Sequence, residues 1–463
     1  MQKMTVEEIT SVVGGQLLCG DPQTVITNVQ YDSREVGEGS LFVPIKGEKV
    51  DAHKFIPQCM EKGAATFTEY DAPEGAGKPY IKVGDTRLAL QKLAAGYRSE
   101  FPALKLAGVT GSVGKTSTKE MIAAALSGGL IVMKTSGNKN SQIGMPMTMF
   151  DIAPEHQAAV IETGMSEFGE MDRLCDVSRP NIAVMTNIGN AHIENLKTRE
   201  NIRSEKLKIT KHFDNEGILF LNGDDELLRE LYGRQPFRTV SFGIKDNNDY
   251  YAKDIDTEGF STEFTCVSRD GERRFVIPAL GVHSVCNALV AIAVARFLGL
   301  DDDKIQIGLR TYKNAPMRQQ IHSLTCGDMD ITLIDDSYNA SPEATKVSLD
   351  VLKSIGNGKT VAVLADMLEL GEQSAKLHYG VGEHLAKIGV DCLIATGELS
   401  RNTAKGAQEN GCPDVTTADS NEQAFEILEA KLSDACTVLV KGSRGMHTDE
   451  ICSKLIAQSS SRS

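Results

Sequence analysis

Short runs of apolar residues divide the chain into three blocks, each with its own spacing of strands and helices. In the first block, strand-like runs at 16–19, 40–43 and 65–68 are separated by turn residues. A loop rich in proline and glycine (DAPEGAGKP) follows, and apolar residues then recur at helical spacing over 86–100. We therefore predict a small N-terminal α/β domain at 1–83 and a helix that opens the next domain.

The second and third blocks alternate buried strands with helices. The strands of the second block read LKLAGVT, AAVIET and NIAVMTNIG, and its most apolar helix reads ALVAIAVARFLGL. The strands of the third block read ITLIDD, TVAVLAD, CLIAT and TVLVKGS. Such alternation predicts parallel sheets with helices on their faces. The expected fold class is α/β with three domains, of which the central one spans 84–314 and a Rossmann-like one spans 315–463.

Length and charge narrow the possible functions. The chain of 463 residues is longer than the roughly 250–300 residues that a single hydrophobic core serves, which agrees with several domains. Its net charge of -14 argues against broad contact with nucleic acid or an anionic membrane, because both would repel it. The sequence has no apolar run of about 18 residues and no basic segment followed by an apolar run at its start. We therefore expect a cytoplasmic protein that binds neither nucleic acid nor membrane.

The segment LAGVTGSVGKTS, at 106–117, predicts a phosphate-binding loop. An apolar strand leads into a glycine turn, and a helix follows. The glycines would let backbone N–H groups approach phosphate oxygens, and the start of the helix adds the positive end of its dipole. Lys115 would reach the outer phosphates of ATP, and the Thr116 hydroxyl would ligate Mg²⁺. The residues expected to cradle the phosphates are Gly111, Ser112, Val113, Gly114, Lys115, Thr116 and Ser117.

Two further polar residues follow strands of the second block. Glu162 ends the strand AAVIE, and His192 comes shortly after the strand NIAVM. In open α/β sheets, ligands bind at the carboxyl ends of the strands, so either residue suits a metal site. Taken alone, a carboxylate at a strand end is more often solvated, and a single histidine is more often structural.

Several other segments resemble the Mur ligase family: GNKNSQIGMP, VIETGM, TNIGNAHIENL, DDSYNASP, LADMLELGE and LVKGSRGM. Together with TGSVGKTS they span nearly the whole chain. The resemblance implies a central ATPase domain and an ATP-dependent ligase that phosphorylates a carboxylate and lets an amine attack the acyl phosphate. It also implies work in the last cytoplasmic steps of bacterial peptidoglycan precursor synthesis, and hence in cell shape and division.

The resemblance assigns roles that the residues alone do not carry. It implies two Mg²⁺ ions, with Lys206 carboxylated by carbon dioxide to a carbamate that ligates the second ion. Lys206 fits the family spacing better than Lys208, which stays an alternative. The metal ligands it implies are Thr116, Glu162, His192 and Lys206, and the catalytic residues are Lys115, His192 and Lys206.

On the nucleotide, the resemblance implies that Asn287 hydrogen-bonds adenine and that Arg318 contacts the phosphates. Asp336 is expected to bind the ribose, with the neighbouring Asp335 as the alternative. The family usually has glycine at the position that Met317 occupies in this chain.

The segment YDSREVGEGSLFVPIKGEKVDAHKF resembles the part of the family that binds the uridine-nucleotide sugar. An arginine beside a hydroxyl suits a diphosphate, because the guanidinium group offers a planar fork of donors. The family commonly has glycine where this chain has Ala52. The candidate substrate-binding residues are Ser33, Arg34, Lys46 and His53.

DDSYNASP and LADMLELGE favour the branch of the family that adds a dipeptide. The Asp-Asn-Pro-Arg and His-Thr-Pro-Asp elements of the branch that adds the third amino acid do not occur in the sequence. The resemblance thus implies UDP-N-acetylmuramoyl-tripeptide and D-alanyl-D-alanine as substrates of a monomeric enzyme. The sister ligase, a folate polyglutamate ligase and a P-loop ATPase of another class stay open as alternatives.

Overall fold

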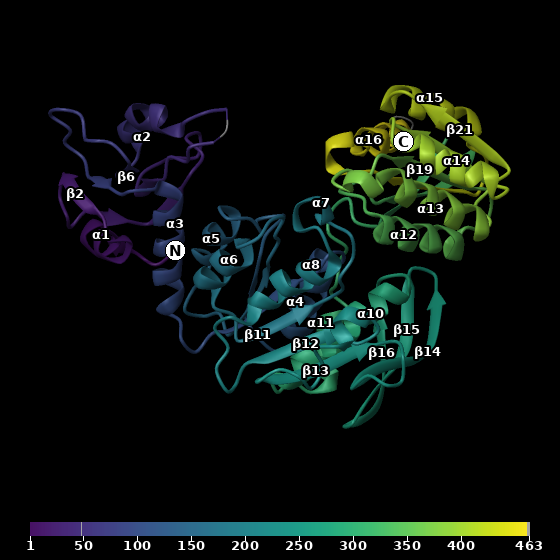
Figure 1. Cartoon of the computed structure of the whole chain (residues 1–463), viewed down its shortest axis with the longest axis horizontal. Helices are drawn as coiled ribbons and strands as arrows, with labels where there is room; N and C mark the ends of the chain where they lie inside the picture. Colours follow the sequence, from purple (N-terminus) through teal and green to yellow (C-terminus); the bar gives the residue numbers. More distant parts are fainter. Residues whose placement is uncertain (48, 461–463) are drawn as a thin grey trace.

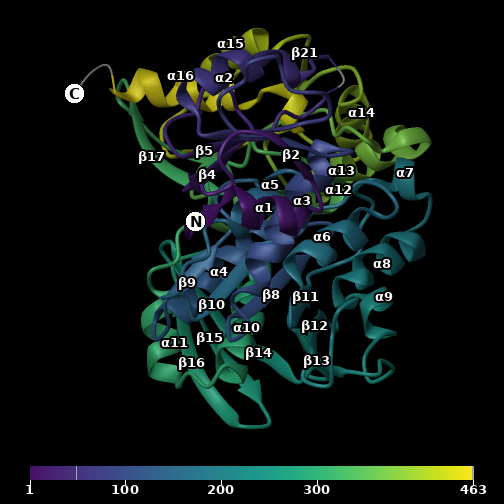
Figure 2. The same ribbon diagram turned by 90° about the vertical axis from the view of Figure 1, so that its left-hand side faces the viewer.

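The computed structural model describes residues 1–47 and 49–460. Three lobes are visible, each built on its own sheet, and the two outer lobes lie over the same side of the middle lobe (Figures 1 and 2). The main sheets of five, nine and six strands fall inside the ranges predicted for the three domains. The predicted α/β class is confirmed, whereas the domain boundaries themselves stay predictions.

The N-terminal lobe contains a sheet in the order β2-β7-β6-β5-β4, in which β2 pairs antiparallel with β7 and the other neighbours are parallel. A short antiparallel pair, β1 with β3, lies beside it. The elements are β1 (Met4–Thr5), α1 (Val6–Val13), β2 (Gln16–Cys19), β3 (Val25–Ile26), β4 (Asn28–Gln30), β5 (Ser40–Phe42), η1 (Ala52–Phe55), α2 (Ile56–Lys62), β6 (Ala65–Thr68) and β7 (Tyr80–Lys82).

Helix α3 (Thr86–Ser99) joins the N-terminal lobe to the middle lobe. The Asp85 side chain caps it by accepting a hydrogen bond from the Leu88 N–H group. Leu90, Leu93 and Tyr97 are buried on the face that packs against α1 on one side and α5 and α6 on the other. The helix predicted over 86–100 is therefore present, and its core belongs to both lobes.

The middle lobe has the strand order β16-β15-β14-β13-β12-β11-β8-β10-β9. The strands from β9 to β14 run parallel, and β14, β15 and β16 form an antiparallel extension that the sequence pattern did not predict. The strands are β8 (Lys105–Thr110), β9 (Val132–Lys134), β10 (Ala158–Glu162), β11 (Ile182–Met185), β12 (Ile218–Asn222), β13 (Arg238–Gly243), β14 (Tyr250–Glu258), β15 (Ser261–Ser268) and β16 (Gly271–Ile277).

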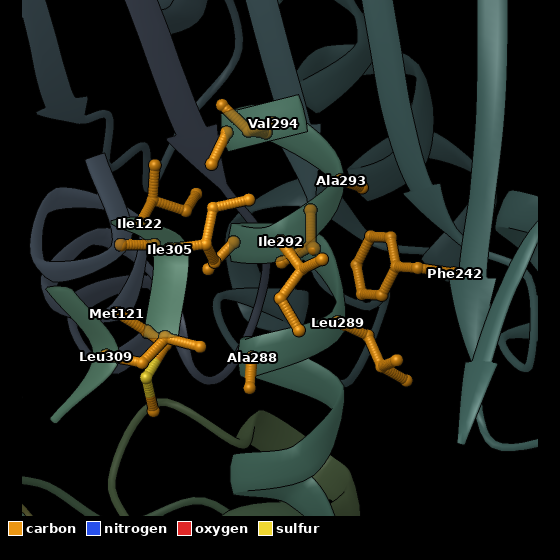
Figure 3. Packing of buried hydrophobic residues seen from close by; sticks show 14 of the residues in the cluster. Met121, Ile122, Phe242, Ala288, Leu289, Ile292, Ala293, Val294, Ile305 and Leu309 are labelled. Atoms are coloured by element: carbon orange, nitrogen blue, oxygen red, sulfur yellow. The ribbon is translucent and has the colours of Figure 1, made fainter. Parts of the chain in front are cut away.

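Helices cover both faces of this sheet, as expected for parallel strands. The apolar helix α10 lies between α4 and α11 on one side and the sheet on the other, and its side chains belong to one buried apolar cluster with those of its neighbours (Figure 3). This explains why α10 is apolar on nearly every face. The helices are α4 (Lys115–Ser127), α5 (Gly144–Met149), α6 (Glu170–Ser178), α7 (Ile193–Leu196), α8 (Arg199–Leu207), η2 (Lys208–Thr210), α9 (Glu226–Arg229), α10 (Val282–Phe297) and α11 (Asp302–Leu309).

The C-terminal lobe has the strand order β17-β18-β22-β19-β20-β21, with β17 antiparallel to β18 and the remaining neighbours parallel. Helices on both faces bury its apolar strands in two clusters. The elements are β17 (Gln320–Cys326), β18 (Met329–Asp335), α12 (Pro342–Ile355), β19 (Thr360–Ala365), η3 (Gly371–Gln373), α13 (Ser374–Lys387), β20 (Cys392–Thr396), α14 (Arg401–Glu409), β21 (Asp414–Ala418), α15 (Asn421–Lys431), β22 (Cys436–Lys441), η4 (Arg444–Met446) and α16 (Asp449–Ser460).

Across residues 1–47 and 49–460, no helix is both long enough and apolar enough to cross a membrane.

Candidate active site

A cavity of about 450 Å³ lies between the middle lobe and the C-terminal lobe. We call it the interlobe pocket. The middle lobe contributes the loop before α4, the carboxyl ends of β10, β11 and β12, and the start of α10. The C-terminal lobe contributes the segment after β18, the start of α12 and the segment after β22. Both sheets therefore present the carboxyl ends of parallel strands to the pocket, as open α/β folds do when they bind ligands.

The predicted phosphate loop forms a tight turn between β8 and α4. Gly111 has to be glycine, because a Cβ atom there would lie 1.9 Å from Thr186 Oγ1. Gly114 has a φ angle of 83° at the start of α4, a conformation that favours glycine. Asn187 holds the turn by accepting hydrogen bonds from the N–H groups of Ser112 and Val113, at 3.1 and 2.9 Å. The N–H groups of the first turn of α4 have no acceptor within the helix and suit phosphate oxygens.

Two lysines converge on this turn. Lys115 Nζ and Lys206 Nζ both donate to the carbonyl oxygen of Gly111, at 2.8 and 2.9 Å. Lys206 is only 2% exposed. Its burial, and after it the charge of Lys115, hold the pKa of Lys206 well below the usual 10.5. Burial also lowers the pKa of Lys115.

Lys208, the alternative to Lys206, lies in a different environment. Its ammonium group pairs with Asp172 and with Glu205, each at 2.7 Å, and its side chain is 38% exposed. Hydrogen bonds to these two carboxylates raise the pKa of Lys208. Two lysines that are two positions apart thus differ in their preferred charge.

Glu162 and Thr116 form a buried oxygen-rich pair next to the loop. The Thr116 hydroxyl donates to Glu162 Oε2 at 2.9 Å, and Asn140 Nδ2 donates to Glu162 Oε1 at 2.7 Å. The Glu162 residue is 1% exposed. A hydroxyl and a carboxylate are oxygen ligands of the kind that Mg²⁺ accepts together with phosphate oxygens and water, so this pair fits the ion. Within the described residues no three His, Cys, Asp or Glu side chains cluster as metal ligands.

His192 lines the same pocket but has its closest charged neighbour in the other lobe. Its Nδ1 atom lies 2.8 Å from Glu369 Oε2 of the C-terminal lobe. The ring beside it lowers the pKa of the Glu369 carboxyl group. His192 also has a φ angle of 62°, an uncommon conformation for a residue other than glycine. The structure therefore places His192 at the junction of the two lobes.

The three candidate nucleotide contacts also line the interlobe pocket. Asn287 Oδ1 accepts a hydrogen bond of 2.8 Å from Thr118, on the second turn of α4. The Arg318 guanidinium group lies over the Tyr338 ring, 4.2 Å from its centroid. Asp336 Oδ2 lies 2.5 Å from both Lys441 Nζ and the Ser348 hydroxyl.

Asp335, the alternative to Asp336, faces a different environment. It accepts hydrogen bonds from the N–H and hydroxyl groups of Ser337 and is not among the residues that line the pocket. Next to Arg318, Met317 has a φ angle of 59°. This left-handed conformation gives a physical reason for the glycine that the family usually has there.

Among the described residues that line the interlobe pocket, none is one of the four candidates of the N-terminal lobe. The Arg34 side chain is 87% exposed and pairs with Asp32 at 2.5 Å, which lowers the pKa of Asp32 to about 2. His53 is buried, with Nδ1 2.6 Å from Asp51 and Nε2 accepting the N–H group of Glu69. The remaining two are Ser33, which is half-buried, and Lys46, which is exposed.

Several residues in or beside the pocket were not predicted from the sequence. Asn140 contacts Glu162, Asn187 holds the loop, Lys441 pairs with Asp336, and Glu369 pairs with His192. Each of them lies in a segment that resembles the family, so a signal was present. Their partners are 22 to 177 positions away in sequence, and residue spacing alone does not pair them.

Three domain descriptions of one family match the chain: "Mur ligase family, catalytic domain" at residues 25–98, "Mur ligase middle domain" at 109–295 and "Mur ligase, glutamate ligase domain" at 317–444. The UDP-N-acetylmuramoyl-tripeptide--D-alanyl-D-alanine ligase of Bacillus subtilis (strain 168) is 36% identical, and the match covers 98% of this chain and 99% of that protein.

Solved structures agree with this match. A crystal structure of MurF from Acinetobacter baumannii has a TM-score of 0.89 at 30% identity, over 99% of both chains. MurF ligase from Thermotoga maritima in complex with ADP has a TM-score of 0.84 at 28% identity, over 94% of this chain and 98% of that chain. The chain therefore belongs to the Mur ligase family.

Proposed function

We propose that this chain joins D-alanyl-D-alanine to UDP-N-acetylmuramoyl-tripeptide, with cleavage of ATP to ADP and phosphate, to give the pentapeptide precursor of peptidoglycan. One observation carries the proposal furthest: the buried Thr116–Glu162 pair, the buried Lys206 amine and the half-buried Lys115 amine converge on the phosphate loop. A phosphate loop alone would indicate nucleotide binding. The Thr116–Glu162 pair adds a position for Mg²⁺, and the chain matches D-alanyl-D-alanine-adding ligases over its whole length. Both observations favour ligation.

The reaction needs two steps. A carboxylate oxygen of the tripeptide attacks the terminal phosphorus of ATP, ADP leaves, and an acyl phosphate forms. The amine nitrogen of the dipeptide then attacks the carbonyl carbon, phosphate leaves with the former carboxylate oxygen, and the nitrogen loses a proton. Lys115 and Arg318 would neutralise phosphate charge during the first step. The walls of the interlobe pocket would keep water from the acyl phosphate in the second.

The nucleotide would lie along the interlobe pocket, with adenine at Asn287 and ribose at Asp336. What supports this placement is that both residues line the same cavity as the phosphate loop. Mg²⁺ would be held by Thr116 and Glu162, and a second ion by His192 and a modified Lys206. When bound, Mg²⁺ neutralises charge on the phosphate oxygens.

We place the carbamate on Lys206. The neutral amine attacks the carbon of carbon dioxide, a carbon–nitrogen bond forms and a proton leaves. Burial, which lowers the pKa of Lys206, favours the neutral amine that this step needs. The negative charge of the carbamate would also be attracted to the ammonium group of Lys115. Lys208, whose pKa is raised by Asp172 and Glu205, keeps its proton.

The N-terminal lobe would bind the uridine-nucleotide end of the acid substrate through Ser33, Arg34, Lys46 and His53. The exposure of Arg34 supports this role, because its guanidinium group, which pairs with Asp32, is open to solvent and within reach of a diphosphate. With domain boundaries at 83 and 314, the acid would come from the first domain and the amine from the third. Residues of the middle and C-terminal lobes together line the pocket, and we propose that the enzyme acts as a monomer. Analytical ultracentrifugation tests that state.

A ligation assay read by the mass of the product tests the proposed function. With ATP and D-alanyl-D-alanine, nucleotide-tripeptides ending in lysine or in diaminopimelate are offered separately, and at least one should yield the pentapeptide. Phosphate release should require the acid and the amine together. Strong phosphate release with ATP alone, or stimulation by DNA or RNA, would instead indicate an ATPase of another class.

The sister ligase is tested by the same assay with other substrates. A nucleotide-dipeptide together with a free diamino acid should give no product. Product from that pair, and none from the tripeptide with D-alanyl-D-alanine, would move the chain to the branch that adds the third amino acid.

A further inference from the structure

We infer that Lys119 and Thr135 are positioning residues that hold Glu162 in place for Mg²⁺. Within the described part of the chain, neither residue is among those that line the interlobe pocket. The inference rests on the proposed function, because that function places Mg²⁺ at Thr116 and Glu162. It is carried by a closed ring of buried hydrogen bonds around Glu162.

Lys119 is a lysine in the interior of the middle lobe. It is 0% exposed, and it lies one helical turn after Thr116 on α4. Its Nζ atom donates to the carbonyl oxygen of Thr135 at 2.7 Å and lies 2.9 Å from Glu120 Oε1. Removing an ammonium group from water costs several kcal/mol, which partners of this kind have to offset. An apolar residue would fill this buried position at a lower cost in free energy. The hydrogen bond to Thr135 therefore indicates a specific role for the lysine.

Thr135 is the next residue in the ring, directly after β9. It is 0% exposed, and all its polar groups are bonded. Its N–H group donates to Val160 O at 3.0 Å, its carbonyl oxygen accepts from Lys119, and its hydroxyl oxygen accepts from the Glu162 N–H group at 3.0 Å. Thr135 therefore ties the end of β10 to α4 through the end of β9.

The ring closes at the carboxylate. Glu162 Oε2 accepts from the Thr116 hydroxyl at 2.9 Å, and Thr116 lies on the same helix as Lys119. Three side chains, those of Thr116 and Lys119 on α4 and of Thr135 after β9, thus hold the backbone and the carboxylate of Glu162. Groups that orient a metal ligand typically change metal affinity or activity by about 10- to 100-fold when removed. We expect Lys119 and Thr135 to act in this way.

The test compares Thr135→Val with Thr135→Ser in the full-length chain. Valine keeps the shape of threonine but leaves the Glu162 N–H group without its acceptor, whereas serine keeps the hydroxyl. Binding of Mn²⁺, used as a probe for Mg²⁺, is measured by electron paramagnetic resonance with ADP bound and without turnover. Thr135→Val should weaken Mn²⁺ binding about tenfold, and Thr135→Ser should stay within about twofold of the wild type. ADP affinity without Mn²⁺ should not change.

Lys119→Met is the second variant. It removes the ammonium group, and Glu120 keeps Lys134 as a partner. We expect weaker Mn²⁺ binding here as well. If Lys119→Met does not fold, the Thr135 pair still decides the matter. Wild-type Mn²⁺ affinity in a folded Thr135→Val variant would overturn the inference, even if its melting temperature fell.

Glu162→Gln distinguishes the metal site at Glu162 from the positioning role of Lys119 and Thr135. If Glu162→Gln weakens Mn²⁺ binding and Thr135→Val does not, the positioning role is wrong while the metal site stands. If Glu162→Gln binds Mn²⁺ as the wild type does, the metal site of the proposed function is wrong, and the positioning role is wrong with it.

Discussion

The residues around the phosphate loop and the candidate substrate residues of the N-terminal lobe are held in different ways. Thr116, Glu162 and Lys206 are at most 6% exposed, and each bonds to a partner from another element. Arg34 is 87% exposed at its side chain, and its partner is Asp32, two positions away. The fold itself fixes the first set before any ligand arrives, and it also buries His53 in the N-terminal lobe. The exposed Arg34, by contrast, would be ordered by the substrate. Changes near the loop should therefore act on kcat, and changes in the N-terminal lobe on KM.

The largest effect is expected from Lys206→Ala. Loss of the carbamate would remove a metal ligand from the reaction site, so kcat should fall by about 100- to 1,000-fold, as when a preorganised electrostatic group is lost. A short carboxylic acid should restore part of the activity by taking the place of the carbamate. Steady-state ligation rates with and without the acid provide the measurement.

Lys208→Ala is the matched control, because it removes an amine two positions away. Its activity should stay within a few-fold of the wild type. Full activity in Lys206→Ala would contradict the carbamate at Lys206. A large loss in Lys208→Ala that a short acid restores would place the carbamate on Lys208 instead.

A smaller effect is expected from Arg34→Ala. The variant should raise the KM for the nucleotide-tripeptide about tenfold, because one charge-assisted hydrogen bond to the substrate is lost. The kcat should stay within about twofold of the wild type. Lys62→Ala, which removes another exposed cation of the same lobe, should change neither value. A fall in kcat with an unchanged KM would contradict the view that changes in the N-terminal lobe act on KM.

The pH dependence of stability should reveal a buried histidine on α13. His378 is 0% exposed. Its Nε2 atom accepts the Met367 N–H group at 3.0 Å, and its Nδ1 atom lies 2.8 Å from the carbonyl oxygen of Ser374, so the ring is neutral. Burial lowers the pKa of His378 below 6.5. As the pH falls, His378 thus becomes protonated near pH 6.5 in the unfolded chain, whereas in the folded chain it stays neutral to a lower pH.

Stability from His378 should therefore be complete above pH 6.5 and decline as the pH falls below it, by up to about 1.4 kcal/mol per pH unit. Melting temperatures at pH 7.5 and 5.5 check this. His378→Gln should melt lower at pH 7.5 and lose fewer degrees between the two values. Equal losses in both proteins would mean that His378 titrates normally.

The smallest effect is expected at Met317, whose φ angle is 59°. Met317→Gly should change the free energy of unfolding by less than about 1 kcal/mol, because relief of backbone strain opposes the added freedom of the unfolded chain. Met317→Val should cost about 1–2 kcal/mol, since a branched side chain tolerates this conformation poorly. Urea unfolding of both variants gives the comparison, and equal stabilities would contradict the strain.

Much of the middle and C-terminal lobes followed from the sequence, because parallel strands that are buried on both faces read as apolar runs. The same logic predicted polar residues at strand ends, and Glu162 and Asp336 both line the interlobe pocket. The antiparallel strands β14 to β16 were missed. Long stretches of β14 and β16 are exposed and carry charged residues such as Lys253 and Arg274, so the apolar signal of these two strands is weak.

The role of Lys206 could not be predicted from its neighbours in sequence. Within NIRSEKLKIT it is one lysine among several charges on a helix, and only the packing of α8 against the phosphate loop buries it. Thr135 and Lys119 are similar cases, since their contacts join α4 to the ends of two strands. Such residues depend on tertiary packing, which local patterns of apolar and polar residues do not encode.

Transfer of oxygen-18 tests most directly that this chain makes an amide through an acyl phosphate. The carboxylate of the nucleotide-tripeptide that is to be joined is labelled in both oxygens, and the phosphate released during ligation with D-alanyl-D-alanine is examined by mass. The proposed reaction predicts one labelled oxygen in each phosphate released, with the other retained in the new amide. Unlabelled phosphate, released at the rate of product formation, would contradict it.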